Sequence, residues 1–370
     1  MDQKADMARP AWIEIDLSAL RYNVGLLHER VGGEVEVMAV VKSDGFGCGA
    51  AATAKAVLDG GAESLAVGNP DDAQAIRDAG IDAPMLLYAS TPPSAAAQVA
   101  ALNVIATVHD MESLAAFADL GTPMDVQFKI EAGLGRLGLN PDDWQAAYAA
   151  VQAADNLRLV GLYTHLNGPD DPASIKRQIA EFERAYQMGL DAGFNNLRRM
   201  VASSNIVLGY PELNYDAVNA GRLMFHLLDG KWADMIDTRP VMSAVKSAII
   251  QVKEFPAGAV VGFLGPEPLA KPTRLAVMPI GFGDGFKHRP PLGEVLVHGQ
   301  RAPVVGRRGI EHTVIDVTDI AAASVDDEVV LLGHQGGAEI TGTELGAWLD
   351  LPLMEILPRL ARTLPKVYLD

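Results

Sequence analysis

Short runs of apolar residues alternate with longer amphipathic stretches between Arg21 and about Gly230. Runs of this length that are apolar throughout are typical of parallel strands buried on both faces. They are Val35 to Val41, Ser64 to Val67, Pro84 to Tyr88, Val104 to Val108, Val126 to Ile130, Leu157 to Tyr163 and Arg199 to Ala202. Helix-length segments such as Ser174 to Gly193 separate them. The alternation predicts an α/β fold in which about eight strand–helix units close into a (β/α)8 TIM-type barrel over residues 17–239, with an open doubly wound sheet as the competing interpretation.

The pattern changes after Arg239-Pro240 to short β-rich runs broken by Gly and Pro. These runs are Ala248 to Val252, Leu275 to Ile280, Gly293 to Val297, Thr313 to Val317 and Glu328 to Leu332. They predict a second, mainly-β domain over residues 240–370. The strand-like segment 10–16 precedes the first helical pattern, which begins near Leu17, and we assign it to the same β domain.

Composition narrows the possible partners and compartments. The net charge of −17 argues against binding to nucleic acid, which requires clustered Lys and Arg. No apolar run approaches the ~18 residues of a membrane span, and the opening residues 1–6 do not resemble a secretion signal, so we expect a cytoplasmic protein. Cys48 is the single cysteine, which excludes an internal disulfide and a thiolate metal cage. We therefore expect no metal centre and no membrane partner.

The most informative segment is Val40-Val41-Lys42-Ser43-Asp44-Gly45-Phe46-Gly47-Cys48-Gly49. It places a lysine at the carboxyl end of an apolar strand, before a glycine-rich turn, and the carboxyl ends of barrel strands form the catalytic face. Desolvation at that position would lower the pKa of Lys42, so that its amine would form a Schiff base readily. The alternative is an ordinary lysine that reaches solvent from a strand end.

Several motifs resemble those of alanine racemases. Residues 11–17 and 39–47 are similar to the family segments A-W-x-E-I-D-L and A-V-V-K-A-D-A-Y-G-H-G. Residues 128–138 resemble K-x-D-T-G-M-x-R-L-G, and residues 161–166 resemble G-x-x-T-H. The resemblance spans essentially the whole chain. It implies a pyridoxal 5′-phosphate enzyme with a barrel and a C-terminal β domain, and a homodimer whose active sites include residues of both subunits.

The resemblance also implies roles for particular residues. Lys42 would hold the cofactor, and Ser204, with backbone N–H groups near Gly221 and Arg222, would bind its phosphate. Arg136 would contact both the cofactor and the substrate carboxylate, a task that the planar guanidinium suits. The other residues at the cofactor and substrate positions are Phe46, His165, Asn219 and Met354 for the cofactor, and Phe282 and Ile310 for the substrate.

The sequence departs from the family at the second proton-transfer group. The family tyrosine in G-Y-x-D-G-Y is donated by the partner subunit, and Phe282 replaces it here. Phenylalanine has no ionisable group and cannot move a proton. Asn219 replaces the arginine that contacts the pyridine nitrogen, while Phe46 and Met354 replace two tyrosines, deleting hydroxyl donors worth about 1 kcal/mol each. His165 has lost both neighbours of its hydrogen-bond network, which favours an ordinary barrel histidine.

Two titratable residues are gained close to this change. The family segment G-R-V-x-M-D-Q reads Gly306-Arg307-Arg308-Gly309-Ile310-Glu311-His312 in this chain. Either Glu311 or His312 would replace the lost tyrosine as the catalytic acid or base, and histidine is the better match to neutral pH. The alternative is that both only adjust the dimer interface.

The leading hypothesis is a racemase or epimerase that acts at Cα of an amino acid through a Schiff base on Lys42. A second hypothesis keeps the cofactor but changes the reaction to aldol cleavage or decarboxylation, for which one proton-transfer face suffices. A third is a catalytically silent homologue that still binds the cofactor. By the same resemblance, Lys129 corresponds to a family lysine that can be carboxylated.

Overall fold

The computed structural model of the chain describes residues 7–88, 91–261 and 268–370. Residues 1–6, on which the expectation about secretion rests, lie outside this part. The chain folds into two compact units, one formed by Ala19–Arg239 and the other by Met1–Ser18 together with Pro240–Asp370. No helix in the described ranges is long and apolar enough to span a membrane.

The first unit is a closed parallel barrel, which confirms the (β/α)8 prediction and excludes the open sheet. Each of the seven predicted runs overlaps a strand. Its strands are, in order, β2 (Glu36–Val40), β3 (Ser64–Val67), β4 (Met85–Leu87), β5 (Ile105–Val108), β6 (Met124–Lys129), β7 (Leu157–Tyr163), β8 (Arg198–Ala202) and β9 (Ala217–Val218). The two-residue strand β9 pairs with both β8 and β2, and so closes the barrel.

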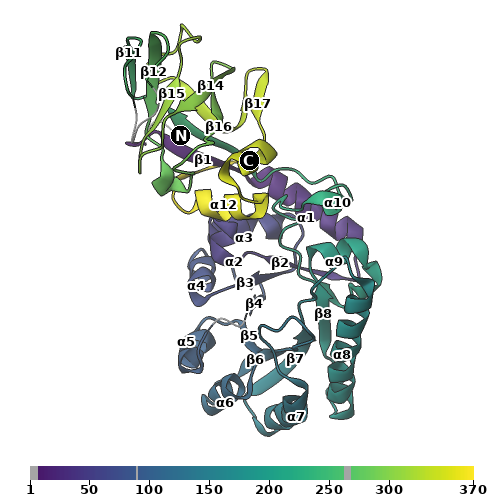
Figure 1. The fold of residues 1–370 in the computed structure, drawn as a ribbon. Coiled ribbons are helices and arrows are strands. Elements are labelled where there is room, and N and C mark those ends of the chain that lie inside the picture. Colours follow the sequence, from purple (N-terminus) through teal and green to yellow (C-terminus); the bar gives the residue numbers. More distant parts are fainter. Residues whose placement is uncertain (1–6, 89–90, 262–267) are drawn as a thin grey trace. The chain divides into compact units, whose positions relative to one another are not determined.

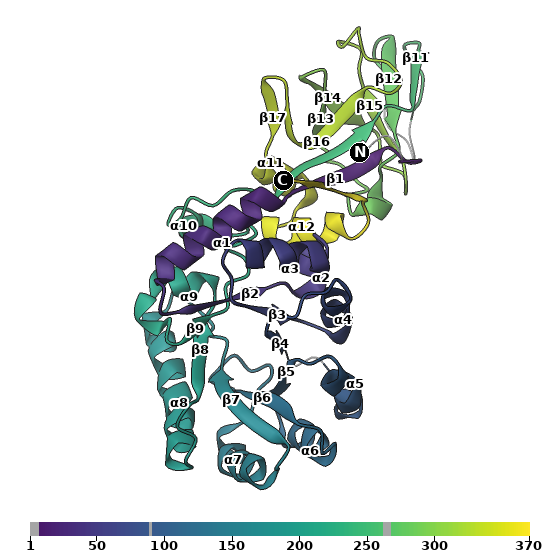
Figure 2. The same ribbon diagram turned by 180° about the vertical axis from the view of Figure 1, so that it is seen from behind.

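Helices cover the outside of the barrel strands, as Figures 1 and 2 show for α4 to α8. The first helix begins at Leu17, two residues before this unit, and continues into it. The helices are α1 (Leu17–Val31), α2 (Lys42–Phe46), α3 (Ala50–Asp59), α4 (Pro70–Asp78), η1 (Pro93–Ala95), α5 (Ala96–Ala101), α6 (Met111–Asp119), η2 (Pro141–Asp143), α7 (Trp144–Ala153), α8 (Pro172–Asp191), α9 (Ser204–Gly209), η3 (Pro211–Leu213) and α10 (Gly230–Ala233). Local signals explain several starts. The side chains of Asn69, Asp110 and Asp171 accept hydrogen bonds from backbone N–H groups in the first turns of α4, α6 and α8.

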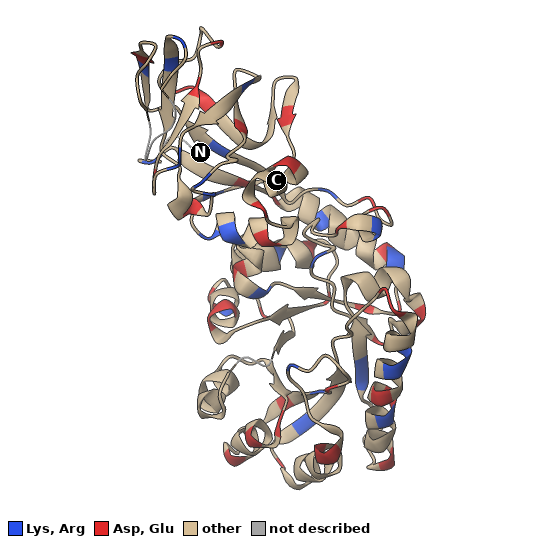
Figure 3. Ribbon diagram, in the orientation of Figure 1, with Lys and Arg blue, Asp and Glu red and all other residues tan. Residues whose placement is uncertain are grey.

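The long helix α8 shows how the acidic sequence is distributed on the barrel surface. Acidic and basic residues are interspersed along it (Figure 3). Its apolar face is buried through residues that include Ile175 and Phe182. Charges on the outer face therefore remain in water while one stripe packs on the strands.

The barrel interior is filled by side chains from several of its strands. A buried cluster contains Met38, Val40, Ala66, Leu86, Tyr163, Met200 and Ala217, with Phe46, Tyr88 and Ile105 packed against it. Tyr88 and Tyr163 bring phenolic hydroxyl groups into this largely apolar cluster. The core therefore becomes polar towards the carboxyl ends of the strands, where catalytic groups of such barrels lie.

The described part of the second unit is built on a ten-stranded sheet with two α-helices and one 3-10 helix, as the mainly-β prediction requires. Its elements are β1 (Ala11–Asp16), β10 (Met242–Ala248), β11 (Gln251–Phe255), β12 (Thr273–Met278), η4 (Phe282–Asp284), β13 (Glu294–Val297), β14 (Gln300–Val305), β15 (Thr313–Asp316), β16 (Glu328–Gln335), β17 (Ala338–Ile340), α11 (Gly342–Leu349), α12 (Leu353–Ala361) and β18 (Lys366–Leu369). The amino-terminal strand β1 lies between β10, to which it is antiparallel, and β18, to which it is parallel.

One predicted strand in this unit is wrong. The run Ala248 to Val252 reads as a single strand, but β10 ends at Ala248 and β11 begins at Gln251. Ile249 is fully buried at the turn between them, whereas Ile250 is 40% exposed. Both isoleucines are apolar, so the sequence pattern continues across the turn and predicts one strand. Only Ile249 packs in the core.

Candidate active site

Lys42 follows β2 and opens a turn of unusual backbone geometry. Ser43, Asp44, Gly45 and Phe46 have φ angles of 60°, 57°, 61° and 56°, so α2 contains a left-handed turn. Each non-glycine residue in this conformation costs roughly 1–2 kcal/mol. The chain therefore holds the segment after the lysine in a conformation that it would not adopt spontaneously.

Neighbouring side chains hold this turn in place. The backbone N–H of Asp44 donates to Oδ1 of Asp72 (3.1 Å), and Oδ1 of Asp44 accepts from the N–H of Ala50 (2.8 Å). A Cβ atom at Gly45 would lie 2.4 Å from Oγ1 of Thr53, so only glycine fits there. The position of Lys42 is thus fixed by the turn that follows it.

The electrostatic surroundings of Lys42 favour the neutral amine. Although the residue reaches solvent, the protein atoms around it lower its pKa by desolvation, and the positive charge of Arg136 lowers it further. A lowered pKa leaves more of the amine unprotonated and nucleophilic at neutral pH.

Lys129 and His165 lie at the ends of the neighbouring strands β6 and β7. Lys129 is only 6% exposed, and desolvation, followed by Arg136, lowers its pKa to about 8 in spite of the opposing charge of Glu131. Its ammonium also lies 5.0 Å from the centre of the Tyr163 ring. Desolvation, together with Lys129, Arg136, Lys42 and Arg222, lowers the pKa of His165 to about 4, so His165 is neutral at physiological pH.

Arg136 is carried on an exposed loop that Glu131 stabilises from within. The Glu131 carboxylate accepts hydrogen bonds from the N–H groups of Gly133 (2.6 Å), Gly135 (2.9 Å) and Arg136 (3.1 Å). Desolvation, the largest influence, would raise the pKa of Glu131, but these backbone donors outweigh it and lower the pKa. The carboxylate therefore acts as the centre of a loop that presents the guanidinium.

Ser204, Gly221 and Arg222 lie together on the β8 and β9 side of the barrel. Oγ of Ser204 accepts from the N–H of Leu223 (3.1 Å), and Arg222 donates to Oδ1 of Asn205 (2.6 Å). A Cβ atom at Gly221 would lie 3.1 Å from Cζ of Phe46, so a larger residue would crowd this ring.

We call the end of the barrel formed by the carboxyl ends of its strands, with the loops that follow them, the barrel mouth. Asn219 and Tyr88 form a polar pair across it. Asn219 follows β9, and its backbone N–H donates to the carbonyl of Ala202 (2.9 Å). Its side chain is hydrogen-bonded to the hydroxyl of Tyr88, which follows β4. Oδ1 of Asn219 is buried and has no partner among the described residues, an arrangement that costs about 1–3 kcal/mol unless a ligand supplies a donor.

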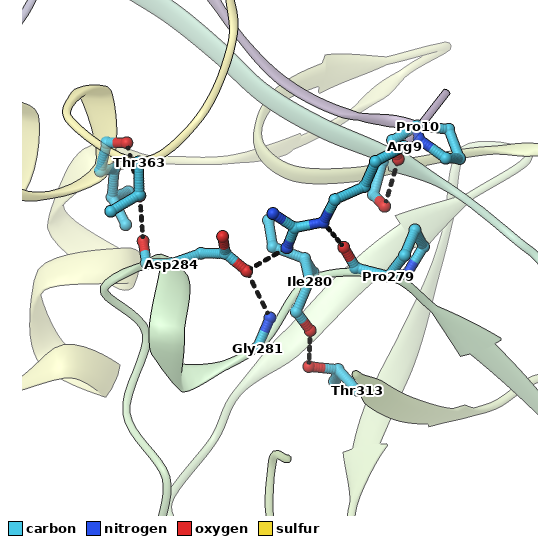
Figure 4. Close-up of polar contacts among 10 residues, drawn as sticks. Arg9, Pro10, Pro279, Ile280, Gly281, Asp284, Thr313 and Thr363 are labelled. Atoms are coloured by element: carbon cyan, nitrogen blue, oxygen red, sulfur yellow. Dashed lines mark hydrogen bonds and ion pairs between the residues drawn. The ribbon is translucent and has the colours of Figure 1, made fainter. Parts of the chain in front are cut away.

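In the β unit, Phe282 lies on a loop that several polar contacts anchor (Figure 4). Asp284 accepts from the guanidinium of Arg9 (2.5 Å) and from the N–H of Gly281 (2.9 Å), while its carbonyl accepts from the Thr363 hydroxyl (3.0 Å). Phe282 remains 38% exposed on this anchored loop.

A second segment is tied to that loop through the backbone. The N–H groups of Phe282 and Gly283 donate to the carbonyls of Gly309 (2.9 Å) and Ile310 (2.8 Å). We call residues 281–288 and 306–313 the loop pair. Ile310 is 63% exposed, and Glu311 and His312 are exposed as well. Met354 is 41% exposed and lies on α12 of the same unit.

Comparison with known proteins decides the family. The family model described as "Alanine racemase, N-terminal domain" matches residues 15–229, and the one described as "Alanine racemase, C-terminal domain" matches residues 241–368. The alanine racemase of Desulfovibrio desulfuricans is 34% identical over 370 residues, which cover 98% of this chain and 99% of the relative. The chain belongs to the alanine racemase family. Lyase chemistry or a silent homologue is not favoured by these similarities.

Solved structures of the family have the same fold. An alanine racemase of Streptomyces coelicolor is 30% identical, with a TM-score of 0.88 and coverage of 99% of this chain and 100% of that one. The alanine racemase of Bacillus anthracis with bound L-Ala-P is 26% identical, with a TM-score of 0.91 over 98% and 96% of the two chains. The resemblance inferred from short motifs therefore extends to the whole fold.

Members of the family use pyridoxal 5′-phosphate, and the barrel mouth of this chain fits that cofactor. The amine of Lys42 has a lowered pKa, and the Ser204 hydroxyl lies beside the backbone near Gly221. The buried, unpartnered Oδ1 of Asn219 offers an acceptor where the family has an arginine.

The structure brings the sequence-predicted residues together in two groups. Lys42, Arg136, His165 and Arg222 influence one another electrostatically at the barrel mouth, and Phe282 and Ile310 are joined in the loop pair. Sequence reasoning missed Tyr88, although a phenol at the end of an apolar run was a usable signal. It also missed Thr107, whose hydroxyl lies 3.0 Å from that of Tyr163 inside the barrel.

Proposed function

We propose that the protein is a pyridoxal-phosphate-dependent racemase acting at Cα of a small amino acid. The observation that carries the proposal is Lys42, which has a lowered pKa and lies after β2 on a strained, well-anchored turn. The curated relatives are named alanine racemase, so alanine is the first substrate to test.

The barrel residues suit the parts of the cofactor. Lys42 would hold it through its amine, Ser204 with the backbone of Gly221 and Arg222 would bind the phosphate, and Asn219 would face the ring nitrogen. Phe46, His165 and Met354 complete the proposed cofactor environment. When bound, pyridoxal phosphate supplies an electron sink that stabilises negative charge at Cα of an amino acid.

Arg136 would bind and orient the substrate carboxylate. A guanidinium makes two parallel hydrogen bonds to a carboxylate, which fixes orientation as well as distance. The backbone around it is held by Glu131, so the loop enters the complex already ordered. Phe282 and Ile310 would form the apolar boundary of the substrate, which favours a small side chain.

Racemisation requires a proton-transfer group on each face of Cα. Lys42 would serve one face, because its lowered pKa leaves more of its amine unprotonated and able to accept a proton. The sequence offers Glu311 and His312 as candidates for the other face. Variants Glu311→Gln and His312→Asn, each tested for deuterium uptake at Cα, check this hypothesis, and unchanged uptake in both would refute it.

We further propose a cytoplasmic homodimer in which each active site combines barrel residues of one subunit with loop-pair residues of the other. Three apolar side chains assigned to the site, those of Phe282, Ile310 and Met354, are exposed on the β unit. A second subunit would remove this apolar surface from water. Sedimentation analysis that finds only monomers at the concentrations used for catalysis would contradict the dimer.

The first experiment combines a spectrum with an isotope assay. The purified protein with added cofactor should absorb near ~420 nm, as expected for a lysine-bound pyridoxal phosphate. Incubation with L- or D-amino acids in deuterated water should give the opposite enantiomer carrying deuterium at Cα. Release of an aldehyde or carbon dioxide instead would identify a lyase, and absence of the band would refute a cofactor site at Lys42.

A further inference from the structure

His288 is a titratable residue next to the position of the lost tyrosine. Its ring packs edge-on against Phe282, with ring centroids 5.1 Å apart and planes 75° apart. Phe282 occupies the place at which the family supplies its second proton-transfer group. An imidazole therefore lies beside the side chain that can no longer move a proton.

One ring nitrogen of His288 is already engaged. Nδ1 lies 2.6 Å from the backbone carbonyl of Arg308, and a carbonyl only accepts, so Nδ1 carries the hydrogen and donates it. In the neutral ring this leaves a lone pair on Nε2. No described residue is hydrogen-bonded to Nε2. A histidine held by one nitrogen, with a base at the other, is a common arrangement for proton transfer.

The segment that holds His288 is itself rigid. The N–H of Arg308 donates back to the carbonyl of His288 (3.2 Å), so the two residues are doubly joined across the loop pair. Arg308 is only 4% exposed, and its guanidinium donates to the carbonyls of Lys287 (3.3 Å) and Leu292 (3.1 Å). These contacts fix the imidazole relative to Phe282.

Glu311 and His312 lack such an arrangement. Both are exposed, and within the described part of the chain neither side chain has a hydrogen bond or ion pair. An unconstrained side chain loses conformational entropy whenever it adopts a reactive position. His288 has already been oriented by the fold.

We propose that His288 is the second catalytic residue, with Nε2 as the proton acceptor and donor on the face of Cα opposite Lys42. The proposal rests on the proposed function. In one direction Nε2 would take the proton from Cα, and bound pyridoxal phosphate would supply the electron sink that stabilises the remaining negative charge. Nζ of Lys42 then supplies a proton to the other face, and the reverse direction exchanges the two roles.

The variant His288→Asn tests this directly. The amide of asparagine can still donate to the Arg308 carbonyl, but it has no base in place of Nε2. Racemisation should fall about 10²- to 10⁴-fold, the usual contribution of a general base. The band near ~420 nm should be unchanged. In deuterated water, one enantiomer should still exchange its Cα hydrogen through Lys42 without inversion, while the other should not exchange.

A matched control and a rescue exclude a merely structural effect. His334 is an exposed histidine of the same unit that pairs with Glu339, and His334→Gln should racemise normally. Adding Phe282→Tyr to His288→Asn restores the family's own group, so racemisation should return at least in part. Equal exchange of both enantiomers by His288→Asn, or failure of the tyrosine to rescue, would overturn the role of His288.

A measurement without turnover gives a second check. Nitrogen-15 spectra of the cofactor-free protein, assigned with His288→Asn and recorded at a pH at which imidazole is neutral, should show the ring hydrogen of His288 on Nδ1. A ring protonated at Nε2 would contradict the proposal. If the wild-type protein binds no cofactor or forms no opposite enantiomer, the proposed function fails instead, and the two failures are therefore distinguishable.

Discussion

The barrel mouth and the loop pair differ from the family in different respects. The barrel mouth keeps Lys42 and Arg136 but exchanges an arginine for Asn219. The loop pair loses its tyrosine and presents Phe282 together with His288 and His312. Apart from Met354, the residues that would hold the cofactor and the substrate carboxylate thus belong to one unit, and candidates for the second proton transfer belong to the other. We infer that cofactor binding and proton transfer have changed independently.

Each region also buries a cation, and the two cations differ in what they can do. Desolvation lowers the pKa of Lys129 to about 8 and that of Arg308 to about 10. Lys129 can therefore lose its proton close to neutral pH, whereas Arg308 keeps its charge and binds carbonyl groups. Lys129 in the barrel is therefore suited to proton transfer, whereas Arg308 in the loop pair is suited to holding backbone segments in place.

The largest expected effect separates the two regions. Lys42→Ala should abolish both the band near ~420 nm and racemisation, because the covalent attachment and one proton-transfer group are lost together. His288→Asn should remove only racemisation. Lys55→Ala, which changes an exposed lysine paired with Asp59 on α3, is the control and should retain both properties. A Lys42→Ala protein with full activity would refute every cofactor-based interpretation of the barrel mouth.

The next effect concerns the buried charge of Lys129. Its pKa of about 8 lies below the ordinary 10.5, so the unfolded chain binds a proton that the folded chain lacks between these values. Stability should therefore rise as the pH increases from 8 to 10.5, and below pH 8 the buried charge costs roughly 3 kcal/mol. Lys129→Met should be more stable than the wild type at pH 7, although loss of the contact with Tyr163 reduces the gain. The variant should also lack the rise in stability between pH 8 and 10.5.

Urea unfolding of the cofactor-free protein in bicarbonate-free buffer measures this difference. Lys55→Met, at the exposed site, should leave the pH dependence as it is in the wild type. If Lys129→Met is markedly less stable than the wild type at pH 7, then the ammonium of Lys129 stabilises the barrel, and the contrast with Arg308 is lost.

Sequence patterns predicted the barrel because its buried strands are continuous apolar runs. They missed β9, whose two residues, Ala217 and Val218, are too few to form a pattern although they close the barrel. The motifs identified Lys42 and Arg136, which carry their own local signature. They did not identify Tyr88 or His288, because the importance of each depends on a partner brought close only by the fold.

A smaller effect tests the turn after Lys42. Gly45→Ala would place a methyl group 2.4 Å from Oγ1 of Thr53 in a left-handed conformation, and we expect a loss of about 2 kcal/mol in unfolding free energy. Cofactor affinity should fall as the turn shifts Lys42. Gly33→Ala is the control, since no atom lies within 4 Å of its Cβ position. Equal stability of the two variants would show that the turn adapts, and that it does not fix the lysine.

The smallest effect asks whether Tyr88 orients Asn219 for the cofactor. Tyr88→Phe removes the hydrogen bond between them at a cost of about 1 kcal/mol, so cofactor affinity should fall about fivefold. Tyr210→Phe also removes one hydrogen bond, to the carbonyl of Pro169, and should leave cofactor affinity unchanged. If Tyr88 acts through Asn219, then Tyr88→Phe should have no further effect in an Asn219→Ala background. Additive losses would instead mean that each residue contacts the cofactor separately, and that the barrel mouth has replaced the family's arginine with two independent groups.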